Sequence, residues 1–103
     1  MDARIAQCLL VSKVLVADGR MTDEERAFLD EVMRHFGLSD AERRSVIDLE
    51  GWDEAEPIAK ALSVEEKRDL VERLVDAASA DGKLSPLELA AVKEISKALG
   101  VVD

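Results

Sequence analysis

A short acidic turn occurs twice in this chain, and its residue types suit the binding of a cation. Both copies follow the pattern Ala-Asp-Gly-x-[Met/Leu]-[Thr/Ser]-x-x-Glu, first at residues 17–25 and again at residues 80–88. Carboxylate oxygens are the ligands that Ca²⁺ and Mg²⁺ prefer in proteins. The pattern therefore predicts four metal ligands: Asp18, Glu25, Asp81 and Glu88.

The spacing inside each turn matches the second half of a calcium-binding EF-hand loop. Five residues separate Gly19 from Glu25, and five separate Gly82 from Glu88. The first half of such a loop is missing, because no acidic residues stand where the earlier ligands belong. A hard cation needs about six or more oxygens, and one half-loop has too few. A site is therefore expected if the two turns face each other across a pseudo-dyad.

The same turns also have a purely structural interpretation. A glutamate three residues after Ser, Thr or Asp forms a capping box, which satisfies free amides at a helix N-terminus. The sequence places such pairs at several expected helix starts: Thr22/Glu25, Ser39/Glu42, Asp53/Glu56, Ser63/Glu66 and Ser85/Glu88. Asp18 and Asp81 can form Asx-type turns in which the following glycine takes positive φ. Both interpretations remain open from the residues alone.

The elements that would position these turns are helices, and the pattern predicts an all-α fold. Apolar residues recur with helical spacing, and no β-type alternation is present. Six helices are expected at about residues 3–17, 23–36, 40–49, 54–62, 64–79 and 86–99. The first is apolar on nearly all sides, so it is expected to be the central, most buried helix.

Length and charge limit the organisation and the partners of the chain. A length of 103 residues predicts a single domain over residues 1–103, with repeat copies at about 5–38 and 68–101. The net charge of −9 argues against nucleic-acid binding, which needs a basic surface. No apolar run approaches a membrane span, so direct membrane insertion is not expected. The single Cys8 favours a reducing compartment, and the cytoplasm is the expected location.

No constellation of catalytic residues is visible, and we expect no enzymatic activity. His35 is the only histidine, and it lies at the edge of an apolar helical stripe, which is typical of a structural imidazole. The chain lacks a His/Cys set for zinc. Trp52 stands in an acidic connector, where we expect it to pack over a helix end or to anchor a protein partner.

At the two acidic turns the chain resembles the TerB-like family, which is named for the bacterial tellurite-resistance protein TerB. The hallmark of that family is a D-G-x-[hydrophobic]-[ST]-x-x-E turn in two related copies, and residues 18–25 and 81–88 both fit it. The resemblance covers nearly the whole chain. It implies a compact bundle of about six helices with a pseudo-twofold repeat of helical hairpins. It also implies acidic residues proposed to bind metal, and a role in cytoplasmic stress-response or membrane-associated assemblies.

Two functional hypotheses follow. The first is a non-catalytic module of bacterial stress response, of the tellurite-resistance type, that binds a divalent cation (Ca²⁺ or Mg²⁺) or a partner. The alternative is a purely structural protein–protein interaction domain without a metal site. Pro86 and Leu87 stand where the first turn has Asp23 and Glu24, so the second turn is the less acidic of the two.

Overall fold

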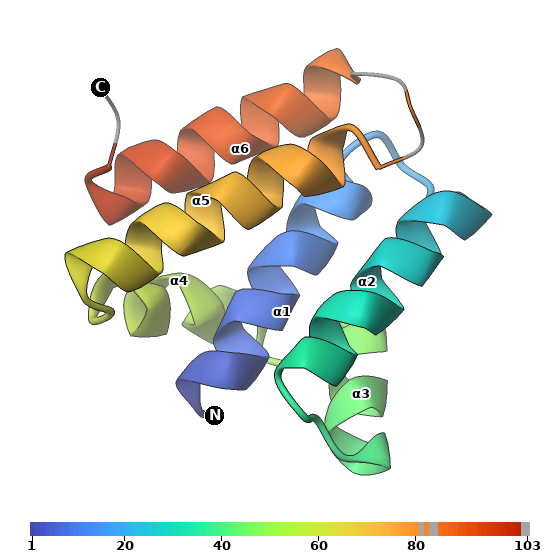
Figure 1. Ribbon diagram of the computed structural model, residues 1–103, viewed down its shortest axis with the longest axis horizontal. Coiled ribbons are helices and arrows are strands. Elements are labelled where there is room, and N and C mark those ends of the chain that lie inside the picture. Colours follow the sequence, from blue (N-terminus) through green and yellow to red (C-terminus); the bar gives the residue numbers. More distant parts are fainter. Residues whose placement is uncertain (81, 83–84, 102–103) are drawn as a thin grey trace.

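The computed structural model describes residues 1–80, 82 and 85–101, and this part of the chain forms six helices (Figure 1). They are α1 (Ala3–Leu15), α2 (Asp23–His35), α3 (Asp40–Ile47), α4 (Trp52–Lys60), α5 (Val64–Ala78) and α6 (Pro86–Leu99). No strand occurs within these described ranges, so the predicted all-α fold is confirmed. Five of the six helices begin at the predicted residue, and α4 is the exception.

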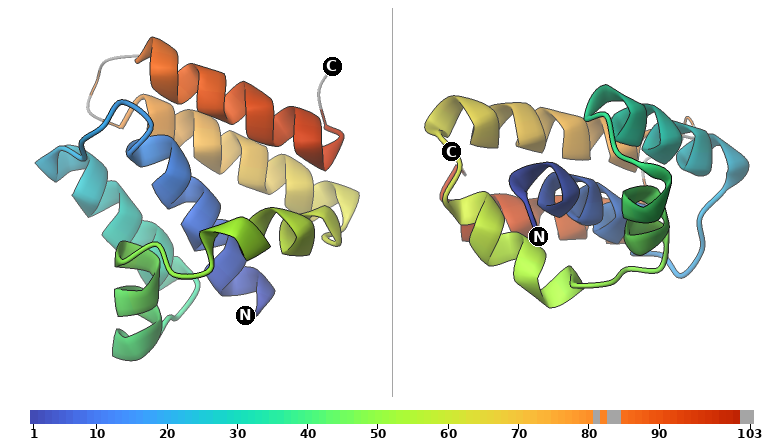
Figure 2. Two further views of the ribbon diagram at one scale, coloured as in Figure 1. Left: turned by 180° about the vertical axis from the view of Figure 1, so that it is seen from behind. Right: turned by 90° about the horizontal axis from the view of Figure 1, so that it is seen from below.

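Helix α1 lies at the centre of the molecule, where it contacts each of the other five helices (Figures 1 and 2). From Ala6 to Leu15 every residue of α1 except Lys13 is buried. A helix that is apolar on nearly all sides needs such complete coverage. Cys8 belongs to this core, and burial raises the pKa of its thiol to about 12, so it is a packing residue and not a reactive thiol.

The remaining long helices bring the two acidic turns to one end of the molecule. Helix α2 returns alongside α1, and α5 and α6 form an antiparallel pair that packs on α1 (Figure 1). As a result, the C-terminal ends of α1 and α5 and the N-terminal ends of α2 and α6 lie toward the same end (Figures 1 and 2). This arrangement is compatible with paired hairpins, and the internal repeat itself stays a prediction.

Side-chain caps account for most of the helix starts. Complete capping boxes open α2, α3 and α5, as predicted from their Thr/Ser and Glu pairs. At α6 the Glu88 N–H donates to Ser85 Oγ at 3.4 Å. Asp2 caps α1 by accepting the Ile5 N–H at 3.1 Å.

Helix α4 begins two residues before its predicted start, and the predicted Asp53/Glu56 capping box is wrong. Gly51 is the N-cap, in the left-handed conformation at φ +75°, and no side chain caps this helix. Asp53 therefore lies inside the first turn, where it cannot act as the cap. Pro57 also lies inside the helix, where it lacks the N–H that would bond the Asp53 carbonyl.

Candidate functional site

The first acidic turn leaves α1 through a tight bend centred on Gly19. The Gly19 N–H donates to the Val16 carbonyl at 3.0 Å, and Gly19 adopts φ +95°, which side chains disfavour. Asp18 is exposed, and its Oδ1 accepts the Arg20 N–H at 3.3 Å. This is the Asx-type turn of the structural interpretation, and it fixes the Asp18 carboxylate at the turn.

Glu25, in the first turn of α2, is almost fully buried, with 1% of its surface exposed. Its Oε1 accepts the Thr22 N–H at 2.8 Å, and its own N–H donates to Thr22 Oγ1 at 3.2 Å. Its Oε2 is buried and has no hydrogen-bond partner in the described part of the chain. Burying a carboxylate oxygen without a partner is costly, so the burial of this atom needs a reason, and a bound water or ion is one.

The second acidic turn shares several features with the first. The Gly82 N–H donates to the Ser79 carbonyl at 2.9 Å, and Gly82 adopts φ +82°. Glu88 is buried to the same extent as Glu25, with 1% of its surface exposed. Asp81 lies outside the described residues, so its role as a ligand stays a prediction. Both glutamates that follow an Asp-Gly pair are therefore buried at the start of a helix.

The described carboxylates do not form a complete metal site by themselves. Within residues 1–80, 82 and 85–101, no three His, Cys, Asp or Glu side chains are grouped closely enough to hold a metal ion. Asp18, Glu25 and Glu88 all belong to that part of the chain. A cation shared by the two turns would therefore need further oxygens, from Asp81, backbone carbonyls or water.

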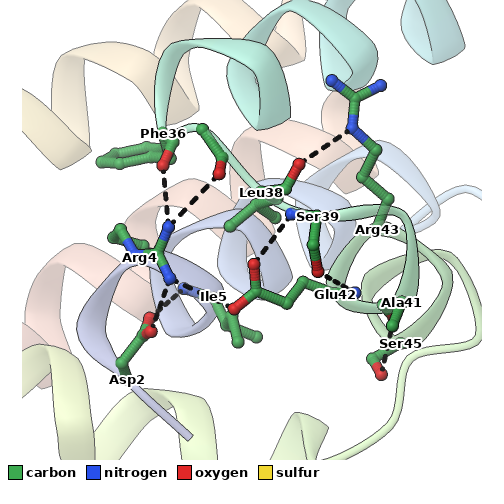
Figure 3. Close-up of polar contacts among 11 residues, drawn as sticks. Asp2, Arg4, Ile5, Phe36, Leu38, Ser39, Ala41, Glu42, Arg43 and Ser45 are labelled. Carbon is green, nitrogen blue, oxygen red and sulfur yellow. Dashed lines mark hydrogen bonds and ion pairs between the residues drawn. The ribbon is translucent and has the colours of Figure 1, made fainter.

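A second network joins the start of α1 to the junction between α2 and α3 (Figure 3). The Arg4 guanidinium donates through Nη1 to the Phe36 carbonyl at 3.1 Å, and through Nη2 to Glu42 Oε2 at 3.1 Å and Asp2 Oδ2 at 2.9 Å. No sequence pattern marks Arg4, because Phe36 and Glu42 lie 32 and 38 residues away. The network holds two helix ends together and leaves the Glu42 carboxylate fully engaged.

Of the other residues singled out from the sequence, Trp52 lines a hollow together with Val16 and Ala17, and His35 is the last residue of α2. Trp52 is partly exposed at the start of α4, and the Lys13 ammonium lies 5.5 Å from the centroid of its ring. This contact places the indole beside the last turn of α1, and both expectations for Trp52 stay predictions. His35 is exposed, and its ring packs edge-on against Phe36 with centroids 5.1 Å apart.

Comparison with known proteins gives one family match. The family model described as Tellurite resistance protein TerB matches residues 4–103, a span that includes both acidic turns. No curated protein and no solved structure matches the chain. In the described part of the chain, no helix has both the length and the apolar character needed to cross a membrane.

Proposed function

The chain belongs to the TerB family, whose model covers residues 4–103, and on this premise we propose that it is a non-catalytic module that binds a divalent cation. The proposed setting is a cytoplasmic stress response of the tellurite-resistance type. The cation is Ca²⁺ or Mg²⁺, and the proposed ligands are the carboxylates of the two acidic turns: Asp18, Glu25, Asp81 and Glu88.

The observation that supports this proposal is the buried Oε2 atom of Glu25. The Thr22 amide satisfies Oε1, and nothing in the described residues satisfies Oε2. Helix capping explains the first oxygen but gives no reason to bury the second. A bound cation, with water completing its shell, would offset the cost of burying this charge.

The surrounding residues suit a site of modest affinity. Asp18 is exposed at the same turn, and its carboxylate is held by the Arg20 amide. The Arg20 side chain brings a positive charge into the turn, which opposes cation binding. When bound, the cation would neutralise the carboxylates that ligate it and tie the end of α1 to the start of α2.

The proposal is tested by the stability of metal-stripped protein as Ca²⁺, and then Mg²⁺, is added. Binding to the native state at a concentration of 100 times Kd should raise the unfolding free energy by about 2.7 kcal/mol. Glu25→Gln keeps an oxygen for the Thr22 amide and removes the charge, so it should abolish this rise. The matched control is Glu42→Gln, which alters the equivalent glutamate of α3 and should leave the cation response intact.

Backbone NMR shifts distinguish a shared site from a site in one turn. For a shared site, Asp18→Asn and Asp81→Asn should each abolish saturable shifts in both turns. If Asp81→Asn has no effect, the second turn takes no part in binding. Absence of any saturable shift at millimolar cation would leave the turns as helix caps and refute the proposal.

A further inference from the structure

A shallow hollow lies between α1, α4 and α6, on the side of α1 that faces Trp52. Its volume is about 340 Å³, and charged side chains, Lys13 and Glu94, stand at its edge. Its floor is apolar: Val16, Ala17, Trp52, Leu87, Ala90 and Ala91. Leu87 is 58% exposed, so its apolar side chain is accessible to a partner. The hollow is therefore an apolar patch at the surface, open to an approaching side chain.

The indole of Trp52 forms the aromatic wall of the hollow. The indole Nε1 of Trp52 is buried without an acceptor in the described residues, so any indole surface that faces solvent is carbon. The Lys13 ammonium lies against the ring, 5.5 Å from its centroid. A tryptophan side chain has only two torsion angles and loses little conformational entropy when a partner binds, and tryptophan is frequent among the residues that dominate binding energy.

One stripe of α6 forms the opposite wall. Leu87, Ala90, Ala91 and Glu94 follow the i, i+3, i+4, i+7 spacing that places residues on a single helix face. The stripe spans two helical turns, about 10 Å. The two alanines leave room between Leu87 and Glu94, so a partner helix can lie close to α6 with an apolar side chain between them.

The rim of the hollow is acidic. A neighbouring hollow of about 330 Å³ shares Lys13 and Trp52 with the first, and it adds Asp53, Glu56 and Pro57. Asp53, Glu56 and Glu94 take part in none of the salt bridges formed between described residues. The residues that line the two adjoining hollows thus include three carboxylates, Glu94 in the first and Asp53 and Glu56 in the second, and one ammonium, that of Lys13, which packs on the indole.

From this charge pattern we propose that the Trp52 hollow, defined by its apolar floor and acidic rim, is the docking site for a basic amphipathic helix of a partner protein. Apolar side chains of that helix enter the hollow between Trp52 and α6, and its Lys or Arg residues face Asp53, Glu56 and Glu94. Complementary charge sets the orientation of the partner and speeds its association. This inference goes beyond cation binding and does not depend on it.

Trp52 itself reports on the proposed site, because it is the only tryptophan and the chain has no tyrosine. The probe is a synthetic helical peptide of about 15 residues, with Leu on one face and Lys on the flanks. It is titrated into the metal-stripped 103-residue protein, so that failure of the cation proposal does not affect the result. We expect a saturable change in Trp52 emission and amide shifts along α4 and α6. Affinity should fall as salt is added.

Matched variants separate specific docking from general attraction to an acidic protein. Leu87→Ser should weaken peptide binding by at least about tenfold, the loss expected for a central apolar contact. Val64→Ser is the control, because Val64 lies in the first turn of α5 and is exposed to a similar extent, 59% against 58%. Its affinity should match that of the wild type. Ala90→Arg, at an exposed position, should block binding through both size and charge.

Several outcomes would overturn the proposal. Equal losses in Leu87→Ser and Val64→Ser would show non-specific attraction. Equal binding of a peptide with Glu in place of Lys would remove the role of the acidic rim. A Trp52 emission that changes with protein concentration alone would indicate a second copy as the occupant. A response to phosphatidylserine vesicles but not to the peptide would indicate that the hollow binds a membrane surface. No response to the peptide or to vesicles would refute the proposed docking site.

Discussion

The junctions that open α2 and α3 have the same capping hydrogen bonds, but the second carboxylate oxygen of the capping glutamate has a different environment in each. In both junctions the glutamate Oε1 accepts the N-cap amide at 2.8 Å, and the glutamate N–H donates to the N-cap hydroxyl at 3.2 Å. Glu42 Oε2 lies 3.1 Å from Arg4 Nη2, and its side chain is 28% exposed (Figure 3). Glu25 Oε2 is buried and has no partner in the described residues.

The two junctions show that a capping box accounts for only one of the two carboxylate oxygens of its glutamate. One oxygen of the glutamate completes the box, so the second is free to serve another purpose. At the α3 junction that purpose is structural, because Arg4 ties α1 to the end of α2. At the α2 junction the second oxygen is buried and has no partner in the described residues, so the capping box does not account for its burial.

The largest effect that can test this comparison is the stability of Glu25→Gln in metal-free protein. The variant keeps an oxygen for the Thr22 amide and replaces a buried carboxylate by a neutral amide, so it should be more stable, because an unpartnered neutral amide costs less to bury than an unpartnered charge. Glu42→Gln should lose stability, because it gives up its ion pair with Arg4. Urea unfolding in the presence of a chelator measures both. If Glu25→Gln is destabilised like Glu42→Gln, the second oxygen of Glu25 already has a satisfying environment.

A smaller effect tests whether the N-cap hydroxyls of the two junctions contribute equally to stability. Thr22→Ala and Ser39→Ala each remove the N-cap hydroxyl, and each should cost about 1 kcal/mol. The two losses should agree closely, because the bonds have the same lengths. Thermal unfolding of both variants at neutral pH measures them. A much larger loss for Thr22→Ala would mean that the cap at α2 also supports the buried carboxylate.

The smallest effect concerns the titration of Glu42. Hydrogen bonds from Ser39, first of all its backbone N–H, together with the Arg4 charge lower the pKa of Glu42 below its usual value of 4.5. The folded state therefore favours the ionised form. The stability that this provides is present above the usual pKa and is lost as the pH falls through the lowered value.

Arg4→Met should raise the pKa of Glu42 only part of the way to 4.5, because the Ser39 amide remains the main cause of the shift. A carboxyl ¹³C NMR titration measures this directly. If the pKa of Glu42 in this variant rose fully to 4.5, the Arg4 charge would be the dominant cause of the shift. In the acid range, the stability of Glu42→Gln should depend less on pH than that of the wild type.

The sequence predicted most of the fold because most of its signals are local. Helix starts depend on residues within one turn of each other, and the Thr/Ser and Glu pairs at α2, α3 and α5 all form as expected. The resemblance to the TerB-like family is confirmed by the match over residues 4–103. The predicted start of α4 is wrong because Gly51, in the left-handed conformation, caps this helix, and no side-chain pattern reveals such a cap.

The amino-acid sequence by itself determined that this chain is all-α, that α1 is its central helix, and where five of its helices begin. Helical periodicity and capping both depend on residues that are close together in the chain, so the sequence alone reveals them. Only the tertiary structure decided that Glu25 is buried while Glu42 is not, and that Arg4 binds Phe36 and Glu42 across more than 30 residues. It also decided that Trp52 and Leu87 share one hollow. Which polar side chains are buried, and which residues meet across long stretches of chain, depend on how the helices pack against one another. The spacing of residues along the chain does not encode these two features.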